Sequence, residues 1–240
     1  METSSKYSDK LNGLILMDRA GLPVLPFLIL DKKMNIEKQL RIFLKDMASQ
    51  KFCTRIDNLN SKMGQESIID ATINNDLAKI EKLVKDNTVF VSHPGNIYKN
   101  FHSVNIMKDY GEIILEIIGP GFITPDMDKR GIVHEQYTFS DNFEQLSHTV
   151  LVDQDQYQSH IQLKIGKDLG KHKEHDSFLL KHTDYVPLSE TEVAYVKHVY
   201  PQVDAVAHKM GYDKFVASLS FIELDGESKP IFWDIFGINR

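Results

Sequence analysis

The sequence predicts an α+β fold with two lobes, in which a few helices accompany mostly antiparallel strands. Three observations support this fold class. The stretches 35–48 and 189–210 carry apolar residues at helical spacing. Two apolar runs, 101–107 and 112–118, lie on either side of the turn sequence KDYG. The last two strands are joined by a DG turn at 225–226, which is typical of a hairpin.

The bulk composition is that of a globular protein. The chain has 240 residues, 42% of them hydrophobic and 26% charged. This length suits two lobes, and we expect an N-terminal lobe over 1–90 and a C-terminal lobe over 91–240. The formal net charge of −6 makes nucleic acid an unlikely partner, because such binding needs a basic surface.

The expected compartment is the cytoplasm. The single cysteine, Cys53, excludes an internal disulfide and suits a reducing environment. The first residues lack the basic and apolar regions of a secretion signal. The longest apolar run, 21–30, is too short to cross a bilayer and contains two prolines, so we expect no membrane association.

Several local signals fix where the helices begin and end. Gly21 suits the residue after a helix, and Asn35 suits a helix N-cap. Ser189 and Glu192 form the pattern of a capping box, and Pro201 predicts a kink further along the same helix. We expect helices at 7–20, 35–48, about 75–85 and 189–210, strands at 22–30, 51–57, 88–92, 101–107, 112–118, 133–139, 157–165, 214–224 and around 232–236, and a loop or short helix at 167–186.

The closing hairpin carries two acidic residues among large apolar neighbours, Glu223 on one strand and Asp234 on the other. An ionised carboxylate in apolar surroundings is costly unless a cation or a donor compensates it. Two such carboxylates side by side predict a divalent metal, and Mg²⁺ combines one or two carboxylates with phosphate oxygens. The alternative is that both acids lie on the solvated face of an amphipathic hairpin.

Two basic residues in the N-terminal third could face an anion. Lys10 lies on the first expected helix, where a surface position is the ordinary outcome. Arg55 lies within the strand sequence FCTRID, where a guanidinium needs a carboxylate or phosphate partner. The histidine-rich stretch KHKEH at 171–175 matches no zinc motif, so we interpret it as a solvated charged run. No P-loop and no nucleophile elbow occurs in the chain.

Taken in order, several motifs resemble the nucleotide-binding domain of the pyruvate phosphate dikinase and phosphoenolpyruvate synthase family, which has an ATP-grasp fold. Lys10 is followed eleven residues later by GLPVLPFLI, and CTRID and MGQES come next in the same order. The segment ILEIIGPGFITPD at 114–126 matches a strand with a glutamate, here Glu116, before a glycine-rich turn. FIEL and FWDIF match the two closing strands.

This resemblance implies an ATP-grasp protein that holds ATP and Mg²⁺ in a cleft between the lobes. Glu223 and Asp234 would bind the metal. Lys10 and Arg55 would neutralise phosphate oxygens. The nucleotide is also expected to contact Glu116, and its adenine is expected near 89–92, so Val89 and Val91 complete the binding set.

The sequence also departs from the family pattern. Phe236 stands where a closing arginine is expected, and Arg240 is close enough to act in its place beside Arg55 as a catalytic residue. The phosphohistidine domain and the barrel that follow in the family are absent from these 240 residues, so a partner protein could supply them.

Three functions remain open from the sequence. The first is an ATP-dependent, Mg²⁺-dependent enzyme that transfers a phosphoryl group to a small-molecule acceptor, or ligates it through an acyl phosphate. The second is a degenerate subunit that binds a nucleotide or a partner protein without catalysis. The third is an interaction domain that binds no nucleotide.

Overall fold

The computed structural model describes residues 7–47, 49–57, 67–92, 100–120, 133–168, 173–224 and 227–238. The chain divides into two compact units. Unit 1 comprises Met1–Ile15 and Val24–Gly95, and unit 2 comprises Leu16–Pro23 and Asn96–Arg240. Helix α1 (Asp9–Arg19) contributes residues to both units. Gly21 follows it with a φ of 76°, which confirms the predicted helix end.

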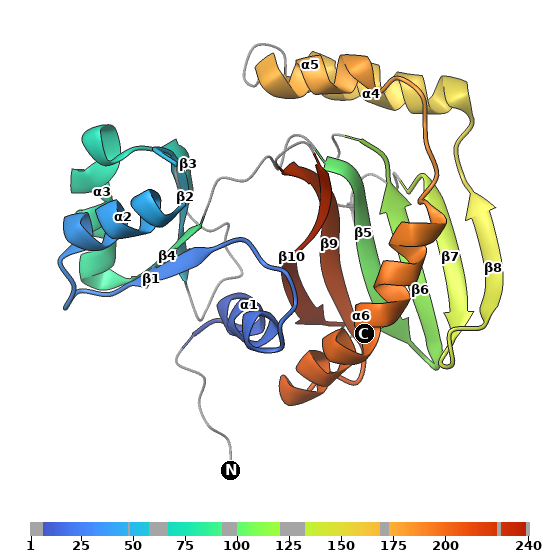
Figure 1. The fold of residues 1–240 in the computed structure, drawn as a ribbon, viewed down its shortest axis with the longest axis horizontal. Coiled ribbons are helices and arrows are strands. Elements are labelled where there is room, and N and C mark those ends of the chain that lie inside the picture. The colour runs from blue at the N-terminus through green and yellow to red at the C-terminus, as the bar shows by residue number, and fades with distance from the viewer. Residues whose placement is uncertain are drawn as a thin grey trace. The chain divides into compact units, whose positions relative to one another are not determined.

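Unit 1 is a four-stranded antiparallel sheet covered by two helices (Figure 1). The strand order is β1-β4-β2-β3. The elements are β1 (Phe27–Leu30), α2 (Ile36–Asp46), β2 (Phe52–Asp57), β3 (Ser67–Ala71), α3 (Ile73–Asp86) and β4 (Thr88–Ser92). Asn35 caps α2, as predicted, and Thr72 caps α3; each side chain accepts a hydrogen bond from the backbone three residues on.

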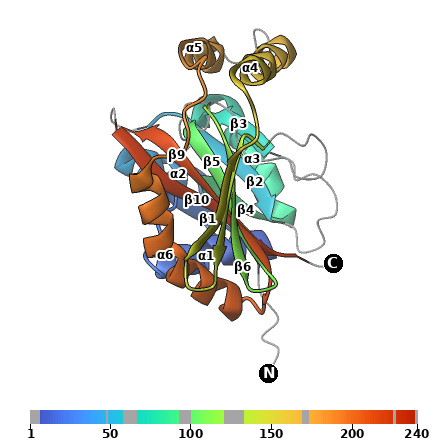
Figure 2. The same ribbon diagram turned by 90° about the vertical axis from the view of Figure 1, so that its right-hand side faces the viewer.

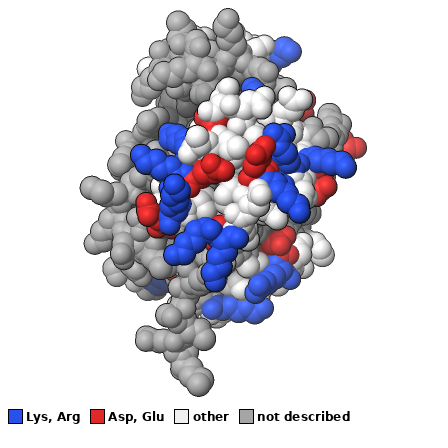
Figure 3. Space-filling view, turned by 90° about the vertical axis from the view of Figure 1, so that its left-hand side faces the viewer, with Lys and Arg blue, Asp and Glu red and all other residues white. Residues whose placement is uncertain are grey.

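The two helices of unit 1 are amphipathic. Their apolar side chains form a core with one face of the sheet, which includes Leu40, Ile80, Val89 and Val91. The face that Figure 3 shows carries Lys and Arg side chains mixed with those of Asp and Glu. This mixture gives α2 and α3 the solvated faces that their sequence periodicity predicts.

Unit 2 is built on a six-stranded antiparallel sheet in the order β10-β9-β5-β6-β7-β8 (Figures 1 and 2). Its strands are β5 (Asn100–Asp109), β6 (Glu112–Ile118), β7 (Glu135–Ser140), β8 (Gln145–Val150), β9 (Phe215–Leu224) and β10 (Glu227–Gly237). Tyr110 and Gly111 join β5 to β6 with φ values of 47° and 83°. Two residues with positive φ form the tight hairpin that KDYG predicts.

Helix α6 (Glu190–Lys209) packs against one face of this sheet (Figure 2). It begins with the predicted capping box of Ser189 and Glu192. The side chains of Val196, Val203 and Val206 are almost completely buried, and Tyr200 contacts the ring of Phe215 on β9. Pro201 lies within the helix without ending it.

Two further helices, α4 (Gln154–Asp168) and α5 (Lys173–Lys181), lie beyond the ends of the strands (Figure 1). The strand prediction for 157–165 is therefore wrong. Tyr157 and Ile161 are buried four residues apart, whereas Leu163, which suggested strand alternation, is 61% exposed. The stretch 167–186 contains α5, in agreement with the short-helix alternative.

The short segment 16–23 completes unit 2. Met17 and Leu22 are buried. The backbone N–H of Phe232 on β10 donates a hydrogen bond of 2.8 Å to the carbonyl of Pro23, so this segment lies along the outer edge of the sheet. No helix within the described part of the chain is long and apolar enough to cross a membrane.

Candidate functional site

A row of polar side chains crosses one face of the six-stranded sheet. Asp234 on β10 pairs with Ser218 on β9, which pairs with Asn105 on β5. Asn105 pairs with Glu116 on β6, which pairs with Gln136 on β7. Residues directly opposite each other on neighbouring strands point to the same face. We call these five residues the polar row.

The centre of this face is buried, although it is polar. Asn105 and Ser218 are 4% and 5% exposed, and the Ser218 hydroxyl donates a hydrogen bond to Asn105 Oδ1 at 3.3 Å. One row further along the strands, the hydroxyl groups of Ser103 and Ser220 lie 3.0 Å apart. Buried polar groups are costly unless they are hydrogen-bonded, and these serines and asparagines bond to one another.

Glu116 is a member of the polar row with unused hydrogen-bonding capacity. Its Oε2 atom is buried and has no hydrogen-bond partner among the described residues. Burial raises the pKa of this carboxyl group above its ordinary value. A ligand that supplies a hydroxyl or N–H donor would therefore stabilise the buried carboxylate of Glu116 by hydrogen-bonding to its Oε2 atom.

The two acids of the closing hairpin do not converge. Asp234 shares a face with Ser218, whereas Glu223 lies five residues further along the regular strand β9. Because side chains alternate along a strand, Glu223 points to the opposite face. The prediction that the hairpin brings both carboxylates to one cation is therefore wrong. A register shift between Phe232 and Asp234 places Asp234 on the face of Ser218, away from Glu223.

In unit 1, the strand register places the predicted nucleotide-binding residues on opposite faces of the sheet. Val89 and Val91 are 0% exposed and belong to the core under α2 and α3, so their side chains are not available to a ligand in this unit. The residue between them, Phe90, pairs with Arg55 on β2. Phe90 and Arg55 therefore lie on the sheet face that the helices leave open, and the placement of adenine near 89–92 stays a prediction.

The side chain of Arg55 makes no hydrogen bond or ion pair with any described residue, although Arg55 is partly buried. Lys10 lies in the first turns of α1 and is also partly buried. Asp57, on the same sheet face as Arg55, accepts hydrogen bonds from the backbone N–H and the hydroxyl of Ser8, which precedes that helix. Arg240 lies outside the described residues.

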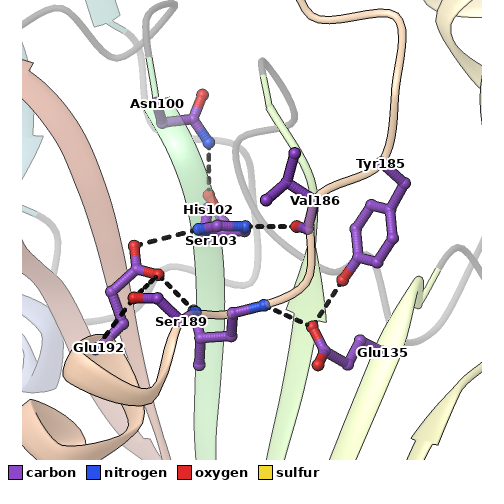
Figure 4. Close-up of polar contacts among 9 residues, drawn as sticks. Asn100, His102, Ser103, Glu135, Tyr185, Val186, Ser189 and Glu192 are labelled. Carbon is purple, nitrogen blue, oxygen red and sulfur yellow. Dashed lines mark hydrogen bonds and ion pairs between the residues drawn. The ribbon is translucent and has the colours of Figure 1, made fainter.

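The other face of the six-stranded sheet holds two buried ionisable residues that are fully engaged (Figure 4). His102 Nε2 lies 2.8 Å from the carbonyl oxygen of Val186, and Nδ1 lies 3.1 Å from Glu192 Oε1. Both ring nitrogens thus face acceptors, so both carry a proton. His102 is a cation that joins β5 to the segment before α6.

The electrostatics agree with this charge state. Burial alone would lower the pKa of His102, but the hydrogen bond and the charge of Glu192, together with the Val186 carbonyl, outweigh it and raise the pKa. Burial would raise the pKa of Glu192, whereas His102 and Ser189 outweigh it and lower the pKa. Each member of the pair therefore favours the charged form of the other.

Glu135, at the start of β7, is 0% exposed and accepts three hydrogen bonds, of which Figure 4 draws the one from Tyr185. The donors are the hydroxyl of Tyr185 at 2.7 Å, the backbone N–H of Leu188 at 2.9 Å and Nε2 of His148 at 2.7 Å. Together, His102 and Glu135 fix the segment 185–189, which leads into α6. These residues have the character of a structural network rather than a reactive site.

The polar row includes residues that sequence reasoning missed, namely Asn105, Ser218 and Gln136. A signal for two of them is present in the sequence. Small polar residues alternate with apolar ones in HSVNIM on β5 and ASLSFI on β9, two strands that are otherwise hydrophobic. This alternation predicts one polar face on each strand, but it does not show that the two faces coincide.

The polar row offers side-chain oxygens that are candidate ligands for a magnesium ion. Asp234, Ser218 and Asn105 offer side-chain oxygens on three neighbouring strands, and oxygen ligands are those that Mg²⁺ prefers. Glu116 is three strands from Asp234, about 14 Å at the usual strand spacing, so these two carboxylates cannot share one ion. Among the described residues, no group of three or more His, Cys, Asp or Glu side chains could hold a metal. The residues therefore fit an ion held by one carboxylate and completed by phosphate oxygens.

Comparison with known proteins gives the fold. No protein-family model and no curated protein matches the chain. D-alanyl-alanine synthetase A from Vibrio cholerae O1 biovar eltor is similar over 98% of this chain and 56% of its own length, with 9% identity and a TM-score of 0.50. N5-carboxyaminoimidazole synthetase from Staphylococcus aureus, complexed with ADP, matches 96% of this chain and 44% of its own, with 11% identity and a TM-score of 0.49.

A third similar structure is the macrocyclase MdnC from Microcystis aeruginosa MRC, bound with the precursor peptide MdnA, with 12% identity and a TM-score of 0.46. It matches 94% of this chain and 51% of its own length, so the chain spans about half the length of these proteins. The chain has the predicted α+β architecture, with an ATP-grasp fold. The similar structures are ATP-grasp ligases, and the narrower resemblance to the dikinase and synthase family stays a prediction.

Proposed function

We propose that this chain binds ATP with Mg²⁺ and acts as an ATP-dependent enzyme of the ATP-grasp type. Its reaction would activate a small-molecule acceptor, either by phosphoryl transfer or by ligation through an acyl phosphate. The observation that supports this proposal best is the polar row, because a stripe of polar side chains with a buried centre is costly on a hydrophobic sheet and is not needed to hold the sheet together. The ATP-grasp fold supports the same class of ligand.

In this proposal, Asp234 would hold Mg²⁺ on the phosphates, with the oxygens of Ser218 and Asn105 beside it. Bound Mg²⁺ would neutralise the charge that develops on the transferred phosphoryl group. Glu116 would accept hydrogen bonds from the ribose hydroxyls, which would satisfy its Oε2 atom. In unit 1, Arg55 and Lys10 stay candidates for binding phosphate oxygens, a role that suits the planar guanidinium of Arg55.

A second candidate is nucleotide binding without catalysis. The residue that faces Asp234 is Ser218 rather than a second carboxylate. A site with one carboxylate neutralises less phosphate charge, because it holds fewer metal ions in place. The two candidates differ in turnover: the enzyme forms ADP with a suitable acceptor, and the binding protein does not.

The proposal is tested by titrating ATP into the protein with and without Mg²⁺ in a calorimeter. We expect Asp234→Asn to remove the gain in affinity that Mg²⁺ provides, a loss of about tenfold or more. Glu223→Gln is the matched control, because it removes a carboxylate from the same hairpin on the opposite face, and we expect it to bind as the wild type does. Equal losses in both variants, or no binding of millimolar ATP by the wild type, would contradict the proposal.

A further inference from the structure

Unit 2 contains a cavity that the proposed nucleotide site does not use. Its volume is about 520 Å³, which is within the range of small-molecule sites. The cavity lies where the segment before α6 meets the ends of β5, β9 and β10. Its walls are mostly apolar and are formed by Phe101, Pro120, Val186, Tyr195, Phe221 and Pro230.

The cavity and the polar row belong to opposite faces of the sheet. His102 and Phe221, which pair across β5 and β9, both line the cavity. Asn105 and Ser218 of the polar row pair on the same two strands. Both residues of the first pair are an odd number of positions from those of the second, and alternation along the strands directs the two pairs to opposite sides. A ligand in the cavity would therefore not contact the polar row.

Aromatic rings make up much of the apolar wall of the cavity. Tyr195 contacts Phe221 edge to face, with ring centroids 6.0 Å apart. His182, which also lines the cavity, lies edge to face with Phe101 at 5.8 Å. Aromatic walls of this kind favour a flat ring, which can meet them face to edge or in an offset stack.

The charged part of the cavity is the ion pair of His102 and Glu192, and three hydroxyl side chains also lie on its lining, those of Ser189, Thr191 and Ser228. Both N–H groups of His102 are already used, one on Val186 and one on Glu192. Glu192 Oε2 accepts from the backbone N–H of Ser189 at 2.9 Å and from its hydroxyl at 2.8 Å. Glu192 Oε1 accepts only the bond from His102 among the described residues. A carboxylate oxygen accepts two hydrogen bonds, so one acceptor position remains.

We propose that this cavity binds a small, uncharged, planar aromatic molecule whose N–H or O–H group donates to Glu192. The ion pair of His102 and Glu192 contributes no net charge that would attract a charged ligand. Its available atom, Glu192 Oε1, is an acceptor, so it would repel an anion. A ring without a donor group would leave this acceptor unused. The site is independent of the proposed nucleotide site.

The first test uses indole as the probe and benzothiophene, which has the same shape but no N–H, as its matched control. Both are titrated against the full chain in ligand-observed NMR. We expect saturable binding of indole, about tenfold tighter than that of benzothiophene, because a hydrogen bond to a charged acceptor is worth about 1.5 kcal/mol or more. Equal affinities, or no saturable binding of indole, would overturn the proposal.

The second test locates the site. Thr191 lines the cavity and is exposed on α6, and Ala194, one turn further on, is exposed outside it. We expect Thr191→Trp to fill the cavity and abolish indole binding, while Ala194→Trp leaves it unchanged. Indole binding is also expected to be the same with and without saturating ATP. Indole binding that survives Thr191→Trp, or that ATP abolishes, would place the probe elsewhere and overturn the assignment.

Discussion

The two faces of the six-stranded sheet bury polar groups in different ways. On the α6 face, Glu135 accepts three hydrogen bonds and His102 uses both ring nitrogens. On the other face, Glu116 keeps a buried oxygen without a hydrogen bond among the described residues. Satisfied charges contribute to the stability of the fold, whereas an unsatisfied one lowers it and is retained for another reason. The comparison separates structural carboxylates from candidate binding ones.

The largest expected effect that tests this comparison is at Glu135. Glu135→Ala leaves the Tyr185 hydroxyl, the Leu188 N–H and His148 without their acceptor. We expect the free energy of unfolding to fall by about 3–5 kcal/mol in a urea titration. Glu135→Gln keeps one oxygen acceptor and should lose less. A fall below about 1 kcal/mol for Glu135→Ala would show that this carboxylate is not structural.

A smaller effect is expected at His102, and it depends on pH. Because the folded pKa of His102 is raised, its contribution to stability is present below the ordinary value of about 6.5 and is lost as the pH rises through the folded pKa. We expect His102→Gln to cost about 1–3 kcal/mol at pH 6 and progressively less toward pH 9. The comparison is made by urea unfolding of both proteins at each pH, and a difference that stays constant would contradict the charged state of His102.

The smallest effect is expected at Glu116, and its sign is opposite. Burial raises its folded pKa, so its ionised form costs stability as the pH rises above the ordinary value for glutamate. We expect Glu116→Gln to raise the free energy of unfolding at pH 7 by less than about 1 kcal/mol, and to have no effect near pH 4. The same variant should bind ATP and ADP more weakly. Destabilisation without any loss of nucleotide binding would make Glu116 a second structural carboxylate.

Sequence reasoning predicted the parts of the fold that local chemistry determines. The cap of α2, the capping box of α6 and the β5–β6 hairpin each depend on a few neighbouring residues, and all three are confirmed. Strand β8 was missed because all six of its residues are exposed, so no alternation marks it. In 157–165, apolar residues at both two-residue and four-residue spacing left the period ambiguous, and the burial of Tyr157 and Ile161 decided for a helix.

The candidate site was predictable only in part, because it depends on register. The sequence shows that Asp234 and Glu116 are acids on expected strands, but the residues between them come from β5 and β9, which are more than a hundred positions apart. Counting along one strand cannot reveal a row that crosses five strands. Glu223 seemed to be a partner of Asp234 because a regular two-residue hairpin would place both on one face. The register shift between Phe232 and Asp234 moves Asp234 to the other face, and the sequence does not show this shift.

The hydrogen bond from Phe232 to Pro23 means that unit 2 is not a single continuous segment of the chain. A fragment that began at Asn96 would lack the proline that ends the sheet, and the backbone amide of Phe232 would be left at a bare strand edge that invites aggregation. Because two separate stretches of the chain make up this lobe, a single continuous segment that began at residue 96 would leave one of them behind.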